Sequence, residues 1–223
     1  MSATIACVGW GSLIWRSGRL PLDARWRRDG PSLPVEFARE SGDGRVTLVA
    51  VPGAVGSRTL WAPLDVEGLG EARRALRRRE RSSPGTIGRW PAPDGSEPVG
   101  RDAVARWAAE RGLDGVVWTA LPPRFGREAG RVPGLREVLD HLAGLRGASR
   151  ARAERYVRRA PRQIRTPYRR AIERRLGWTP RGSPRMRSPG GEARFRPAAP
   201  PRGTGNDGRV GSEESAGLQG RES

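Results

Sequence analysis

An apolar run near the N-terminus, broken by two glycines, constrains the fold of this chain more than any other stretch. From residue 5 it reads Ile-Ala-Cys-Val-Gly-Trp-Gly-Ser-Leu-Ile-Trp. This pattern indicates a buried strand and then a tight loop, because glycine adopts positive φ easily and lets a ligand approach the backbone. Amides in the loop from Trp10 to Leu13 would then point into a small cavity that suits an anion. The alternative interpretation is an ordinary bend at Gly9 and Gly11 within a buried strand.

The segments after this loop carry strand patterns that lie close together in the sequence. Residues 35–38 and 45–51 predict a β-hairpin, and 58–66 predicts another strand in which Pro63 indicates an edge. Residues 114–121 form a continuous apolar run that is typical of a central strand. Together with the helical segments described next, these strands predict an α+β fold with a mixed or antiparallel sheet.

Helical spacing is clearest in residues 69–80, where Glu80 ends an otherwise apolar stripe. A carboxylate on the inward face is unusual, so Glu80 is either functional or an ion-pair partner for the arginines beside it. Helices are also predicted at 101–111 and from 135 to 145. His141 lies off the apolar stripe of the latter, so we expect it to face solvent. That position argues against nucleophilic catalysis with a histidine base.

All 42 basic residues are arginines, and they exceed the acidic residues by 18. Without lysine the chain has neither a Walker A lysine nor a Schiff-base lysine. The arginine usage, with 31 glycines and 20 prolines, is typical of a GC-rich bacterial genome. The C-terminal helices expected from Arg146 to Arg175 are especially basic. They form either the basic face of a packed helical layer or a surface for nucleic acid.

The single cysteine and single histidine exclude a structural zinc site made from these residue types, so we expect no metal. Cys7 has no disulfide partner, which indicates a buried thiol in a reducing compartment. No run approaches the ~20 apolar residues of a membrane span. These features predict a cytoplasmic protein without membrane contact. We expect one domain over residues 1–179 and a disordered tail over 180–223, which is poor in apolar side chains.

The heptapeptide from Gly9 to Trp15 resembles the Gly-Tyr-Gly-Ser-Leu-Ile-Trp signature of the γ-glutamylcyclotransferase superfamily, which includes the ChaC-like enzymes. A second signature of that superfamily is a Leu-x-x-Arg-Glu element at the end of a helix. Residues Leu76 to Glu80 read Leu-Arg-Arg-Arg-Glu and are similar to it. The resemblance covers residues 4–125. It implies a small mixed β-barrel with flanking helices, to which this chain adds the C-terminal Arg-rich helices.

The resemblance also implies an acyl-transferring enzyme that releases 5-oxoproline from a γ-glutamyl peptide or amine without a cofactor. Glu80 would be its catalytic acid/base, and the substrate-binding residues would be those of the loop: Trp10, Gly11, Ser12 and Leu13. The chain departs from the family where Trp10 replaces a tyrosine. The family's pocket tyrosines have no counterpart outside the basic helices, which hold Tyr156 and Tyr168. The segment 85–98 is also a poor strand where the family continues its sheet.

Two other functions are consistent with the sequence. The first is an Arg-rich nucleic-acid-binding protein, for which we expect weak and sequence-indifferent binding because few aromatic residues interleave the arginines. The second is a non-catalytic module that binds a small ligand on the same fold. A cavity that contains both Glu80 and the loop amides favours the enzyme, whereas an exposed Glu80 paired with arginines favours the others.

Overall fold

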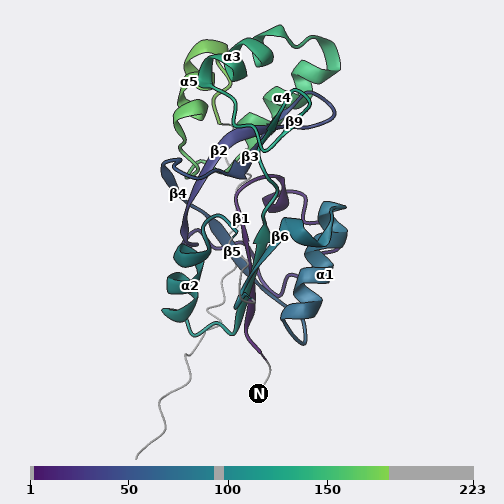
Figure 1. Cartoon of the computed structure of the whole chain (residues 1–223), viewed down its shortest axis with the longest axis vertical. Helices are drawn as coiled ribbons and strands as arrows, with labels where there is room; N and C mark the ends of the chain where they lie inside the picture. The colour runs from purple at the N-terminus through teal and green to yellow at the C-terminus, as the bar shows by residue number, and fades with distance from the viewer. Residues whose placement is uncertain (1–2, 93–97, 181–223) are drawn as a thin grey trace, which may run out of the picture. The chain divides into compact units, whose positions relative to one another are not determined.

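The computed structural model describes residues 3–92 and 98–180 of the chain (Figure 1). Apart from Pro180, the predicted tail at 180–223 lies outside the described residues. The described part is an α+β fold with two mixed sheets and five α-helices, which confirms the predicted class.

The first sheet has the order β5-β1-β7-β6. Its strands are β5 (Leu60–Leu64), β1 (Ile5–Gly9), β7 (Gly115–Thr119) and β6 (Ile87–Trp90). β1 and β7 are parallel, so their carboxyl ends meet at one edge of the sheet. β7 is a central strand and Pro63 lies on the edge strand β5, as the sequence predicted.

The second sheet is built on the predicted hairpin. Its strands are β2 (Ser32–Glu40), β3 (Val46–Ala50), β4 (Gly56–Arg58), β8 (Arg124–Phe125) and β9 (Glu128–Ala129). β2 pairs antiparallel with β3 and β4 and parallel with β8. The strands that the structure describes thus belong to two open sheets and do not close into a ring of hydrogen-bonded strands.

Helices cover both sheets. Their bounds are α1 (Leu69–Glu80), α2 (Arg101–Ala109), α3 (Leu135–Gly144), α4 (Gly147–Arg159) and α5 (Pro167–Leu176), with short 3-10 turns η1 (Ser12–Ile14) and η2 (Pro84–Thr86). Figure 1 shows α1 and α2 on either side of the first sheet, and α4 and α5 contact β3 and β2 of the second.

β1 is buried on both faces, because its side chains alternate between two cores. Ala6 and Val8 belong to a core shared with the second sheet, α2 and the C-terminal helices. Cys7 belongs to the core under α1 and is fully buried, as expected, and this burial raises the pKa of its thiol. The N-terminal run is therefore the central layer of the described fold.

The C-terminal helices are packed elements whose arginines serve more than one role. Ile164 and Ile172 are fully buried, and the Arg169 side chain is buried among them. The Arg169 guanidinium donates to the backbone carbonyls of Pro161 (2.6 Å) and Ala160 (2.9 Å), which follow the end of α4. At least one arginine of this run therefore acts as a structural link inside the helical layer.

Two local expectations were wrong. His141 does not face solvent: it is half-buried, its Nε2 lies 2.8 Å from the carbonyl oxygen of Gly44, and its ring meets the ring of Phe125 edge-on. The segment 85–98 contains a true strand, β6, whose Gly88 lies directly opposite Trp118 of β7. Gly88 weakens the strand pattern in the sequence, so β6 was not predicted. The glycine is needed there because the large indole of Trp118 across the strand pair leaves no room for a side chain.

In the described ranges, none of the helices has the length and apolar character needed to cross a membrane.

We expect Gly88→Ala to destabilise the fold, because the added Cβ would lie 2.3 Å from Cε2 of the fully buried Trp118. Forcing extra volume into a packed core costs about 1–3 kcal/mol. Gly85→Ala is the matched control, since a Cβ there meets no described atom within 4 Å. It should change the free energy of unfolding, measured by urea denaturation, by less than about 0.5 kcal/mol. Equal losses in both variants would contradict the packing argument.

Candidate functional site

Three elements end at the same place in the fold. The parallel strands β1 and β7 end at Gly9 and Thr119, and α1, which packs on both, ends at Glu80. A cavity of about 300 Å³ lies there. All the site residues named from the sequence line it: Trp10, Gly11, Ser12, Leu13 and Glu80. The structure therefore brings the two sequence signatures together.

Only one of the two oxygens of the Glu80 carboxylate accepts hydrogen bonds from the described residues. Oε1 accepts hydrogen bonds from Arg79 Nη1 (2.6 Å) and from the Thr119 hydroxyl (3.0 Å). The side chain is only 13% exposed. Among the described residues, no partner is recorded for Oε2, so this oxygen is free to meet a ligand in the cavity.

Arg79 is itself fixed by the loop that follows β1. Its guanidinium donates to the backbone carbonyl of Arg16 (2.6 Å) and lies 3.4 Å from the Ser12 hydroxyl. The ion pair that the alternative interpretation expected is thus present, but it is a largely buried pair at a cavity wall. The pair locks Glu80 in one position beside the loop.

Trp10 has a structural role in the cavity wall. Its side chain is 4% exposed, and the indole N–H donates to the backbone carbonyl of Leu48 in β3 (3.2 Å). This bond joins the end of β1 in the first sheet to the second sheet. Because this N–H is already bonded to the backbone of β3, the Trp10 side chain has no donor left for a ligand.

The residues of the loop after β1 line the cavity, and their backbone N–H groups differ in whether the protein satisfies them. Ile14 N–H donates to the carbonyl of Gly11 (3.1 Å), and Arg16 N–H donates to that of Ser12 (2.9 Å). Within the described part of the chain, no protein acceptor is recorded for the N–H groups of Ser12 and Leu13. These two amides are the available donors for an anionic group.

Tyr156 of α4 lines the same cavity, and the sequence reasoning did not place it there. Its ring is 5% exposed and meets the rings of Trp15 and Phe37 edge-on. Its Oη accepts the backbone N–H of Leu48 (3.1 Å), and burial raises the pKa of this hydroxyl to about 12. The hydroxyl therefore stays protonated and can donate into the cavity. No local signal marks it, because it lies in an Arg-rich helix far along the chain.

Gly11 is needed because Tyr156 approaches it closely. Gly11 does not use the positive φ that glycine allows, because its φ is −122°. A Cβ at this position would instead lie 2.7 Å from the Tyr156 Oη. The loop glycine therefore leaves room for a side chain of this protein.

Two arginines that the sequence did not single out complete the cavity. Arg45 lies over the Tyr156 ring at 5.7 Å and pairs with Asp43 at 2.8 Å. Arg39 donates to the carbonyl of Pro122 (2.7 Å), and burial, followed by the charge of Arg124, lowers its pKa.

Thr119 is a further site residue that was not predicted from the sequence. It could have been found from its position at the end of the predicted central strand. The cavity thus combines one carboxylate with several cationic and neutral donors.

Over the described ranges, no group of three or more His, Cys, Asp or Glu side chains is placed to hold a metal ion. The chain matches no known family model and no curated protein sequence.

A double-mutant cycle tests the Gly11–Tyr156 contact. Gly11→Ala should destabilise the protein, whereas the same change should cost much less beside Tyr156→Phe, since the nearest remaining ring atom would be 3.8 Å away. We expect a coupling energy of about 0.5–3 kcal/mol in urea denaturation. Gly42→Ala, where a Cβ meets no described atom within 4 Å, is the control and should cost the same in both backgrounds. A coupling near zero would show that the two residues do not touch.

Proposed function

We propose that this chain is a γ-glutamylcyclotransferase-like enzyme that releases 5-oxoproline from a γ-glutamyl peptide or amine. The observation that carries the proposal is that Glu80 and the loop residues from Trp10 to Leu13 line one cavity of about 300 Å³. This volume is at the lower end of the range for small-molecule sites, ~300–1,000 Å³. The Oε2 of Glu80 and the amides of Ser12 and Leu13, which have no partner within the described residues, are the kinds of group that the reaction needs.

The reaction is an intramolecular aminolysis. The α-amino nitrogen of the γ-glutamyl unit attacks its own side-chain carbonyl carbon and forms the ring C–N bond. The bond from that carbon to the leaving nitrogen then breaks. The α-ammonium group first releases one proton to solvent. The resulting amine loses a second proton as it attacks, and the leaving nitrogen gains one, so a single carboxylate can serve as base and then as acid. Because nucleophile and electrophile belong to one molecule, the protein mainly folds the substrate into the reactive geometry.

Each group of the cavity has a role in this scheme. Glu80 Oε2 accepts the proton of the attacking amine and returns it to the leaving nitrogen. Arg79 and Thr119 are positioning residues, because both donate to Oε1 and leave Oε2 free. The amides of Ser12 and Leu13 stabilise the oxyanion that forms at the attacked carbonyl.

The family's missing tyrosine hydroxyl is supplied, in this proposal, by Tyr156 of α4. Tyr156 and Trp10, which occupies the sequence position of the family tyrosine, bond to the same backbone residue, Leu48, so the Tyr156 hydroxyl lies at the same junction as the Trp10 side chain. We further propose that the two sheets correspond to the family's small mixed β-barrel, with the C-terminal Arg-rich helices as an addition that closes the site. The shared core of the two sheets supports this correspondence.

Glu80→Gln tests the catalytic role. It keeps the size of the side chain but removes the proton carrier, so 5-oxoproline release should fall by about 10²–10⁴. We expect little change in thermal stability, because Gln still accepts from Thr119. Glu110→Gln is the control, since Glu110 is 72% exposed and lies outside the cavity, and it should keep full turnover.

The other functions give different results in the same assays. Full activity of Glu80→Gln would remove Glu80 from the mechanism. Binding of γ-glutamyl compounds to the native protein without any 5-oxoproline release would identify a non-catalytic ligand-binding module. A pure ion-pair role would appear as a loss of stability without an effect on chemistry, and because the pair is largely buried this loss should exceed the ~0.2–1 kcal/mol of an exposed pair.

A further inference from the structure

A second, larger cavity of about 960 Å³ adjoins the candidate active site. The two cavities share four lining residues: Ser12, Arg45, Glu80 and Tyr156. Glu80 lies on both walls, so the cavities meet at the carboxylate that the proposed reaction uses. A ligand that extends from the small cavity into the larger one therefore passes Glu80.

The larger cavity is lined mainly by arginine. Nine of its sixteen lining residues are arginines, whereas arginine makes up 42 of the 223 residues of the chain. The Arg-rich composition alone therefore does not explain this lining. Three of the nine, Arg152, Arg155 and Arg159, come from α4, and their helical spacing puts them on the same face as Tyr156. The helix face that brings Tyr156 to the small cavity also brings these three arginines to the large one.

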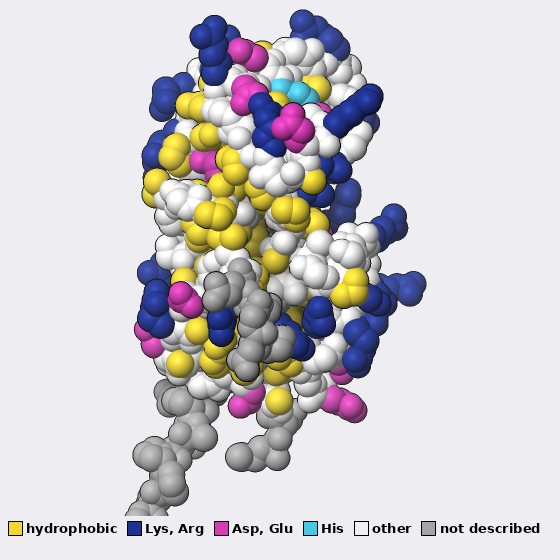
Figure 2. Space-filling view, in the orientation of Figure 1, with side chains coloured by type: hydrophobic (Ala, Val, Ile, Leu, Met, Phe, Trp, Pro, Cys, Tyr) yellow, Lys and Arg dark blue, Asp and Glu magenta, His cyan; other side chains and the backbone are white. Residues whose placement is uncertain are grey.

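The opposite wall is equally basic. It comes from the end of α1, including Arg78, and from the loop after β1, including Arg16 and Arg19. Figure 2 shows dark blue arginine side chains gathered on the side of the molecule where α1 lies. Arginines from segments far apart in the sequence thus face one cavity.

The positive charge of this cavity is not neutralised by the described protein. Its two carboxylates are already engaged: Glu80 with Arg79, and Asp43 with Arg45 (2.8 Å) and Arg152 (3.6 Å). Among the described residues, no carboxylate is recorded at ion-pair distance from the remaining arginines of its walls: Arg16, Arg19, Arg78, Arg81, Arg155 and Arg159. A concave surface with this surplus attracts and holds anions.

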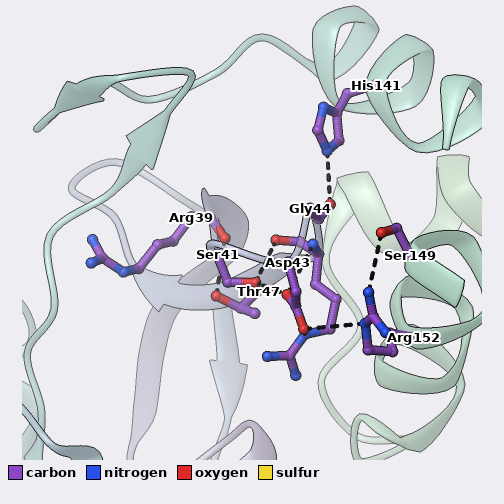
Figure 3. Close-up of polar contacts among 9 residues, drawn as sticks. Arg39, Ser41, Asp43, Gly44, Thr47, His141, Ser149 and Arg152 are labelled. Atoms are coloured by element: carbon purple, nitrogen blue, oxygen red, sulfur yellow. Dashed lines mark hydrogen bonds and ion pairs between the residues drawn. The ribbon is translucent and has the colours of Figure 1, made fainter.

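Polar contacts fix one wall of the cavity in place. Figure 3 shows the turn between β2 and β3 held from two helices: His141 of α3 contacts the carbonyl oxygen of Gly44, and Arg152 of α4 pairs with Asp43. Arg152 also donates to Ser149 in its own helix (3.2 Å). The arginine face of α4 is therefore anchored to the hairpin that carries Arg45.

We propose that the preferred substrates are γ-glutamyl compounds whose leaving half carries several negative charges, such as short oligomers of γ-linked glutamate. This inference rests on the proposed function. In that reaction Glu80 returns a proton to the leaving nitrogen, so this nitrogen lies at the junction of the two cavities. The γ-glutamyl unit fills the small cavity, and the leaving half extends into the arginine-lined one. Each further γ-linked glutamate adds a carboxylate that an arginine can bind.

A small polyanion fits this site better than a nucleic acid does. The arginines converge on a concave cavity of a size typical for small ligands, and that cavity opens onto the catalytic carboxylate. Its aromatic side chains, Trp15 and Tyr156, pack against each other edge-on. These two rings are therefore not arranged to stack on nucleic-acid bases.

The first test compares kcat/KM for a γ-linked glutamate tetramer with that for γ-glutamylalanine. The tetramer should be preferred, and the preference should fall as salt rises, because partly exposed charges are screened. The triple variant Arg152→Gln, Arg155→Gln and Arg159→Gln should lower the preference about tenfold, mainly through KM, as expected for three modest charge contacts. The matched control changes three exposed arginines outside both cavities to Gln, namely Arg106, Arg136 and Arg174. It removes the same charge and should keep the preference.

The second test measures binding of the tetramer to the Glu80→Gln protein by calorimetry, which does not require turnover. Binding should weaken when the three α4 arginines are also changed to Gln. If 5-oxoproline is released but the tetramer is not preferred, or the preference survives the triple variant, this inference is overturned and the proposed function stands. If no compound yields 5-oxoproline but the tetramer binds through these arginines, the proposed function fails and the anion cavity stands. A single-stranded oligonucleotide that displaces the tetramer at physiological salt would overturn the assignment in favour of nucleic acid.

Discussion

The backbone of one residue, Leu48 in β3, holds the candidate site together. Its carbonyl accepts the indole N–H of Trp10, and its N–H donates to the hydroxyl of Tyr156. These two hydrogen bonds tie the loop after β1 and the helix α4 to the second sheet. All the groups involved are buried, so leaving either bond unmade would cost about 1–3 kcal/mol of desolvation. The close approach of Tyr156 to Gly11 follows from the same junction, and so does the position of the arginine face of α4.

Charge in this region is arranged around a single partly buried carboxylate. Glu80 is fixed through one oxygen by Arg79 and Thr119, and the neighbouring wall carries a surplus of arginines. A buried carboxylate requires hydrogen-bonded partners to offset its desolvation, and Arg79 provides them. Arg45 and Arg152 share Asp43, whereas the other arginines of this wall have no such structural explanation among the described residues. Electrostatics thus connects the proposed chemistry of Glu80 with the proposed selection of an anionic leaving half.

Much of the local structure was predictable because it depends on neighbours in the sequence. The helix from Leu69 to Glu80, the hairpin around residues 41–44 and the central strand near residues 115–119 all follow from periodicity and turn residues. β6 was not predictable in this way, because its Gly88 is set by an indole on another strand. His141 was misplaced for a related reason: helical spacing puts it off the apolar stripe, but its partner Gly44 belongs to a distant hairpin.

The sequence by itself determined the strand and glycine loop at the N-terminus, the helix that ends in Glu80, and the arginine excess of the chain. These depend on local backbone preferences and composition. Only the tertiary structure decided that the loop and Glu80 line one cavity, because the parallel pairing of β1 with β7 brings the ends of separate segments together. It also decided that Tyr156 reaches this cavity and that three arginines of α4 line the larger cavity beside it. Contacts between residues so far apart along the chain arise from packing, and no pattern within a short window of sequence encodes them.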